Sequence, residues 1–116
     1  MADILHNYDF DAAVSGASYS AVQFQFPEED GFYLVGTKIY LQLRKKPGQL
    51  IAAEFSTENE KLVITGDYAF ELPEQIILVP ADTWYYDILF VFPDGRRDYL
   101  FAGKWPVQPT ITSKKS

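Results

Sequence analysis

Hydrophobic and polar positions alternate most clearly over residues 83–92, which we predict to form the central strand of the fold. Side chains along a strand point to opposite faces in turn. One face of this stretch is large and uncharged, and it holds Trp84, Tyr86, Ile88, Phe90 and Phe92. The opposite face holds Tyr85, Asp87, Leu89 and Val91. We expect the uncharged face to point into the core.

The next three residues, Pro93-Asp94-Gly95, are those of a tight turn, because proline presets φ and glycine accepts the left-handed conformation. Residues 96–102 are then expected to return as the second strand of a β-hairpin. The sequence 103–106, with its glycine and proline, predicts an interruption of that strand. Residues 107–112 are predicted to be an edge segment, because prolines belong on sheet edges.

Similar alternation predicts further strands elsewhere in the chain. The clearer ones span 19–26, 37–44, 50–56, 61–65 and 75–79. Residues 3–10 and 68–72 show weaker patterns. A type II turn is predicted at Lys46-Pro47-Gly48-Gln49, between the second and third of these strands. The best helix candidate, 72–78, is weakened by Pro73 and by adjacent isoleucines, so the whole pattern indicates an all-β sandwich or barrel.

The 116 residues suffice for one domain, and we expect a single unit over 1–116, with an N-terminal segment at 1–16 and a frayed tail at 113–116. The net charge of −6 makes binding to nucleic acid unfavourable. No apolar run is long enough to span a membrane, and no secretory signal is recognisable at the N-terminus. The absence of cysteine excludes disulfides and thiol chemistry, and it fits synthesis inside a cell.

Candidate catalytic and metal-binding residues are few. His6 is the only histidine, and no Gly-x-Ser-x-Gly motif accompanies it, so we interpret it as an ordinary strand residue. The acidic run Glu28-Glu29-Asp30 suits a solvated turn better than a calcium site. The carboxylates at 82, 87, 94 and 98 offer no convincing catalytic pair. We therefore expect no enzyme activity, no metal and no cofactor.

Asp87 is unusual because it lies in the middle of a strand between aromatic residues. Two interpretations are open: its carboxylate faces water, or it pairs with a cation such as Arg44, Arg96 or Arg97. A half-buried ion pair of this kind would fix strand register more than it would stabilise the fold.

Taken in order, several motifs form a recognisable series. They are ASYSAVQFQF, YLVGT, KIYLQLR, FSTENEKLVIT, IILVPADT, WYYDILFVFPDG and FAGKWPVQPTIT. Together they resemble the small immunoglobulin-like accessory proteins of tailed phages and prophages, which serve in tails, baseplates and head decoration. The resemblance covers about residues 17–112. The positions that match the family pattern are structural ones: Gly36, Arg44, Asp87, Gly95 and Gly103. Pro106 beside Trp105 departs from it, where an unbroken strand is expected.

The resemblance implies a single antiparallel β-sandwich of immunoglobulin-like type. It also implies a non-enzymatic structural or assembly protein of a phage particle, located in the virion and in the bacterial cytoplasm during assembly. We expect other phage structural proteins as partners and a homo-oligomer, because particle components repeat around symmetry axes.

Aromatic residues are abundant, at 16% of the chain, and such side chains concentrate binding energy at interfaces. We predict the protein-binding residues to be Tyr85, Leu89, Val91 and Trp105. Addition of a strand to an exposed sheet edge is a second mode of docking. The alternative function is a carbohydrate-binding module on a phage tail or a bacterial surface protein, because exposed aromatic rings also stack on sugars.

Overall fold

The structure, a computed structural model, describes residues 6–109, and it is built almost entirely of β-strands. One 3₁₀ turn, η1 (Glu28–Asp30), interrupts them. The strands in chain order are β1 (His6–Asn7), β2 (Ala13–Val14), β3 (Ser18–Tyr19), β4 (Val22–Gln25), β5 (Lys38–Arg44), β6 (Ala53–Ser56), β7 (Val63–Gly66), β8 (Ala69–Leu72), β9 (Gln75–Ile76), β10 (Asp82–Val91) and β11 (Arg97–Gln108).

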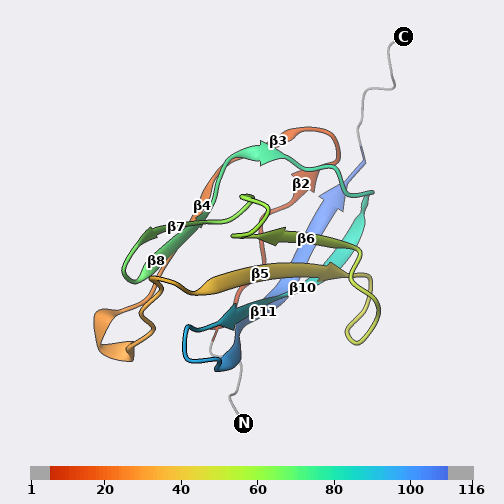
Figure 1. The fold of residues 1–116 in the computed structure, drawn as a ribbon. Helices are drawn as coiled ribbons and strands as arrows, with labels where there is room; N and C mark the ends of the chain where they lie inside the picture. The colour runs from red at the N-terminus through yellow and green to blue at the C-terminus, as the bar shows by residue number, and fades with distance from the viewer. Residues whose placement is uncertain (1–5, 110–116) are drawn as a thin grey trace.

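The strands form one main sheet and two smaller ones (Figure 1). The main sheet has the order β1-β11-β10-β5-β6, and β2 also pairs with β11. The smaller sheets are β4-β8-β7, at the left of the view, and the pair β3-β9. The predicted all-β sandwich-like fold is confirmed. One detail differs, because β1 and β2 run parallel to β11 while the other pairs are antiparallel.

The main sheet and the three-stranded sheet enclose an aromatic core. The Phe24 ring stacks on Phe70 with centroids 4.6 Å apart, and both rings belong to the smaller sheet. Phe70 meets Phe90 of β10 edge-on at 5.5 Å, and Phe24 meets Phe101 of β11 at 5.3 Å. Such offset and edge-to-face arrangements are the favoured geometries of aromatic pairs. The two sheets are therefore joined by interlocking rings.

The predicted inward face of β10 is confirmed. Its four side chains and that of Phe92, which directly follows the strand, are buried, and none is more than 6% exposed: Trp84, Tyr86, Ile88, Phe90 and Phe92. In β5 the three alternating apolar side chains Ile39, Leu41 and Leu43 are fully buried as well. Alternation identified the core face correctly in both central strands, because one side of each meets a second layer.

Both predicted turns are present. Gly95 has a φ of +92°, and its N–H donates to the Phe92 carbonyl oxygen at 2.9 Å. Gly48 has a φ of +83°, and the Gln49 N–H donates to the Lys46 carbonyl oxygen at 3.2 Å. The positive φ values explain why glycine occupies these two positions.

The predicted interruption at 103–106 is wrong, because β11 continues through it. The carbonyl oxygens of Ala102, Lys104 and Gln108 accept bonds from the N-terminal segment. Alternate residues share a direction, so the nitrogen of Pro106 also points toward that segment and away from β10. A proline at this position removes no hydrogen bond from the β10–β11 ladder, and the strand tolerates it.

Other strand boundaries differ from those predicted. The predicted strand 75–79 contributes only β9, although burial still alternates beyond it: Ile77 and Val79 are buried, and Leu78 between them is 76% exposed. The predicted strand 19–26 is divided between β3 and β4, and the predicted strand 50–56 begins only at Ala53. No α-helix forms over 72–78. The predictions for residues 1–5 and for 110–116, the tail included, lie outside the described residues.

Candidate functional site

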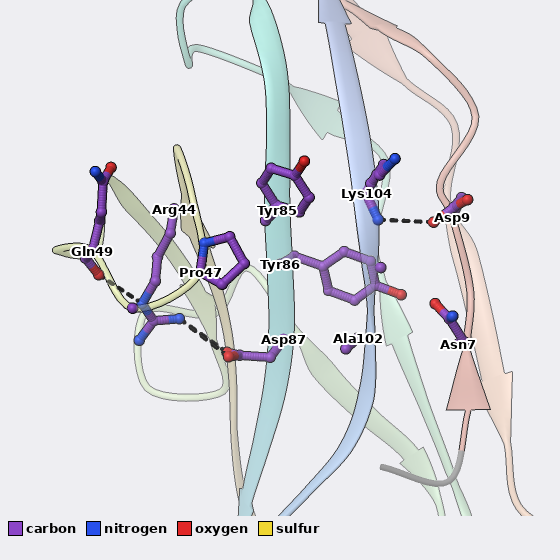
Figure 2. Close-up of a pocket in the computed structure, with 12 residues that line it drawn as sticks. Asn7, Asp9, Arg44, Pro47, Gln49, Tyr85, Tyr86, Asp87, Ala102 and Lys104 are labelled. Atoms are coloured by element: carbon purple, nitrogen blue, oxygen red, sulfur yellow. Dashed lines mark hydrogen bonds and ion pairs between the residues drawn. The ribbon is translucent and has the colours of Figure 1, made fainter.

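A groove of about 790 Å³ opens over the face of the main sheet opposite the aromatic core. Its floor is formed by Tyr85 and Asp87 of β10 together with residues 102–104 of β11. The hairpin loop at Pro47–Gln49 borders one side, and Asn7 and Asp9 border the other. Figure 2 shows these groups arranged on both sides of β10, with Arg44 reaching toward Asp87.

Arg44 is held by a network that crosses three strands. Its Nη1 lies 3.2 Å from both carboxylate oxygens of Asp87, its Nε donates to the Gln49 carbonyl at 3.0 Å, and its Nη2 donates to Gln42 Oε1 at 3.0 Å. Gln42 in turn donates to Glu54 on β6 at 3.0 Å. Of the two interpretations of Asp87, the ion pair with Arg44 is therefore the one that the structure shows.

The other side of the groove is built from the N-terminal segment. Asp9 Oδ1 accepts the backbone N–H of Lys104 at 2.9 Å, across 95 residues of sequence. The Tyr8 N–H donates to the Ala102 carbonyl at 3.0 Å, and the Phe10 N–H donates to the Lys104 carbonyl at 2.9 Å. A Cβ at Gly103 would lie 2.0 Å from the Tyr8 carbonyl oxygen, so only glycine permits this close approach.

Two consecutive tyrosines of β10 have opposite roles. Tyr85 is half-buried in the floor of the groove, and the Lys104 ammonium lies 5.9 Å from its ring centroid. The hydroxyl of Tyr86 donates to the Tyr8 carbonyl at 2.5 Å. Burial, with Tyr8 and Asp9 close by, raises the pKa of Tyr86, so its hydroxyl remains a donor at all ordinary pH values. The hydrogen bond from Tyr86 holds the N-terminal segment, which borders the groove, in place beside the sheet.

The four predicted contact residues do not come together. Tyr85 lines the groove, and Val91 is half-buried near the other end of β10. Leu89 is only 4% exposed, although it lies on the outer face, where it is opposite Tyr40 and Tyr99.

Trp105 is fully buried. It is opposite Trp84 on the core side of the sheet, and its ring stacks on Phe10 at 4.5 Å. The expectation that Leu89 and Trp105 lie at the surface is wrong. Neighbouring side chains cover Leu89, and because β11 is unbroken, the alternation of its side chains points Trp105 into the core.

Sequence reasoning missed the most exposed apolar residue among those described. Leu50 is 92% exposed and Ile51 is 45% exposed on the loop that joins β5 to β6. The predicted strand 50–56 includes both residues, and the lack of polar alternation at this pair is the available signal against a strand there. Asn7, Asp9 and Lys104 were also missed, because no local pattern reveals a pairing between segments so far apart in the chain.

Within residues 6–109 no cluster of three histidine, cysteine or acidic side chains is arranged to hold a metal ion. In that same part of the chain no helix has the length and apolar character to cross a membrane. The sequence matches no protein-family model and no curated protein.

Proposed function

We propose that this protein is a non-enzymatic assembly protein of a phage or prophage particle and that it acts by docking to other proteins. The observation that carries the proposal is the apolar loop tip, which we define as Pro47, Leu50 and Ile51. The loop that joins β5 to β6 projects beyond the sheet (Figure 1), and on this loop Leu50 is 92% exposed and Ile51 is 45% exposed. Single exposed apolar residues are common, but adjacent ones on a projecting loop suit insertion into a partner.

The groove beside the loop tip extends the proposed interface. Tyr85 stays a predicted contact, since its ring lies in the groove that Pro47 borders. Val91 stays one as well, at the far end of the same strand face. Interfaces place such apolar and aromatic groups at their centre, with polar residues around them. The proposed partners are other structural proteins of the particle and further copies of this chain, in the virion and in the bacterial cytoplasm during assembly.

Particles purified from a host that carries the gene provide the test. We expect peptides of this protein in the particles, and light scattering after size exclusion should show self-association at high protein concentration. The double variant Leu50→Ser/Ile51→Ser should reduce incorporation at least about tenfold, as for the loss of interface anchors.

Leu78→Ser serves as the control, because Leu78 is 76% exposed elsewhere and lies outside the proposed interface. Circular dichroism would confirm that both variants fold. Reproducible absence of the wild-type protein from particles, or equal incorporation of the tip variant and the wild type, would contradict the proposal.

A further inference from the structure

We propose that the groove over Tyr85 and Asp87 binds a neutral saccharide. This inference does not depend on docking through the loop tip. It rests on the size of the groove, the balance of its charges, the fixed geometry of its polar groups and the aromatic ring in its floor.

The volume of about 790 Å³ lies in the range of small-molecule sites, which is roughly 300–1,000 Å³. Three neighbouring strands (β5, β10 and β11), the β5–β6 loop and the N-terminal segment contribute to its lining. A groove that is open along the sheet can hold one sugar unit while a longer chain continues out of it.

The charges in the groove balance one another. Arg44 and Lys104 contribute two positive charges, and Asp9 and Asp87 contribute two negative ones. All three guanidinium nitrogens of Arg44 already make hydrogen bonds, so it is poorly placed to capture an anion. The nearby carboxylates would further repel a phosphate or an acidic sugar. These features favour a ligand that carries no charge.

The polar groups in the groove include acceptors with spare capacity. A carboxylate has about four lone-pair sites. Among residues 6–109, Asp87 receives hydrogen bonds from a single nitrogen, Arg44 Nη1, and Asp9 uses only Oδ1, for the Lys104 N–H. A ligand that suits them must donate several hydrogen bonds without bringing a positive charge, and sugar hydroxyls have this property. Hydrogen bonds to ionised acceptors are stronger than those between neutral groups.

The acceptors are also fixed before any ligand arrives. Arg44 orients the Asp87 carboxylate, and the Lys104 backbone orients that of Asp9. Pre-positioned groups avoid the entropy cost of ordering side chains on binding. The ring of Tyr85 adds a flat apolar surface between them, against which the C–H face of a pyranose can pack. Figure 2 shows Tyr85 between the Arg44 side and the Asp9 side of the groove.

The test is a glycan array with the full-length protein, followed by calorimetric titration with the best neutral oligosaccharide and with an acidic oligosaccharide of equal length. We expect binding to at least one neutral glycan and at least about tenfold weaker binding to the acidic one. Tyr85→Ala should weaken binding at least tenfold, whereas Tyr85→Phe should keep most of it because the ring remains. Asp87→Asn should weaken binding several-fold.

Tyr33→Ala is the matched control, because Tyr33 is 50% exposed and lies outside the groove. Its binding should equal that of the wild type. Three outcomes would overturn the proposal: no neutral glycan bound at millimolar concentration, an acidic glycan preferred, or equal losses in Tyr33→Ala and Tyr85→Ala. Circular dichroism on each variant separates lost binding from lost folding. The tip variant Leu50→Ser/Ile51→Ser keeps every residue that lines the groove, so it should bind the glycan as the wild type does even where its incorporation into particles is lost.

Discussion

The two faces of β10 differ although they belong to the same ten residues. The inner face is uncharged and packs against rings of the three-stranded sheet, whereas the outer face carries an ion pair and a half-buried tyrosine. The inner face contributes the burial that drives folding. The ion pair on the outer face fixes the register between β5 and β10, and we propose that the same face also binds ligands or partners. A strand at the centre of a sheet can thus divide stability and recognition between alternate side chains.

The largest expected effect tests this division directly. Phe90→Ala on the inner face should lower the free energy of unfolding by about 3–5 kcal/mol, because it empties a fully buried site among four other rings. The neighbouring Val91→Ala on the outer face should cost less than about 1.5 kcal/mol, since Val91 is only half-buried. Urea denaturation measures both. Similar losses in the two variants would show that the faces do not divide the roles in this way.

The second effect concerns the sheet edge that borders the groove. Gly103→Ala would place a methyl group 2.0 Å from the Tyr8 carbonyl oxygen, so the N-terminal segment must move away. We expect a loss of about 1–3 kcal/mol in thermal or urea unfolding, together with faster amide exchange at Tyr8 and Phe10.

Gly66→Ala provides a matched control for this substitution. Its new methyl group would meet only the Ala69 side chain, at an ordinary 3.7 Å. It should change the free energy of unfolding by less than about 1 kcal/mol. A Gly103→Ala protein as stable as this control would contradict the tight contact.

The third effect is the energy of the Arg44–Asp87 pair. The side chains are 18% and 30% exposed, so a double-mutant cycle with Arg44→Met and Asp87→Asn should give a coupling of about 1 kcal/mol. The exposed pair Lys38–Glu58, at 60% and 56%, is the control and should give less than about 0.5 kcal/mol. Equal coupling energies in the two pairs would show that the Arg44–Asp87 pair stabilises the protein no more than an exposed surface pair does.

The smallest effect is a dependence on alkaline pH. Burial, with Asp11 and Tyr8 nearby, raises the pKa of Tyr19 to about 12, from an ordinary value of 10.0. Between these two values the unfolded chain releases a proton that the folded chain keeps, so stability should fall as pH rises through this window. Below pH 10 the group has no effect on the slope. In Tyr19→Phe, urea denaturation at successive pH values should show a shallower decline, and an unchanged decline would contradict the shift.

The strand faces were predictable because alternation is a local signal, and both turns were predictable because proline and glycine determine backbone angles locally. The partner of Asp87 was one of three candidates, since the choice of Arg44 depends on the register between β5 and β10. The exposure of Leu50 was not predictable from its hydrophobicity. The burial of Trp105 was not predictable, because Pro106 beside it indicated a break in the strand. The strand tolerates this proline because its nitrogen points toward the N-terminal segment and away from β10, and the local sequence does not reveal that direction.

The groove was the least predictable feature. Its two carboxylates, Asp9 and Asp87, and its lysine come from segments with no sequence pattern in common. Only the pairing of the N-terminal segment with β11 brings them together. Local sequence patterns reveal faces and turns, whereas a site shared between distant strands requires the topology.

The parallel pairing of β1 and β2 with β11 has a consequence for the order of events during synthesis. Phe10 and Ala13 are each only 2% exposed, yet the strand beside them is made about a hundred residues later. Until residues 97–108 leave the ribosome, these early residues have no ladder to join. Phe10 and Ala13 therefore stay unpaired while the chain is being made. The pairing of β1 and β2 with β11 is among the final steps of folding.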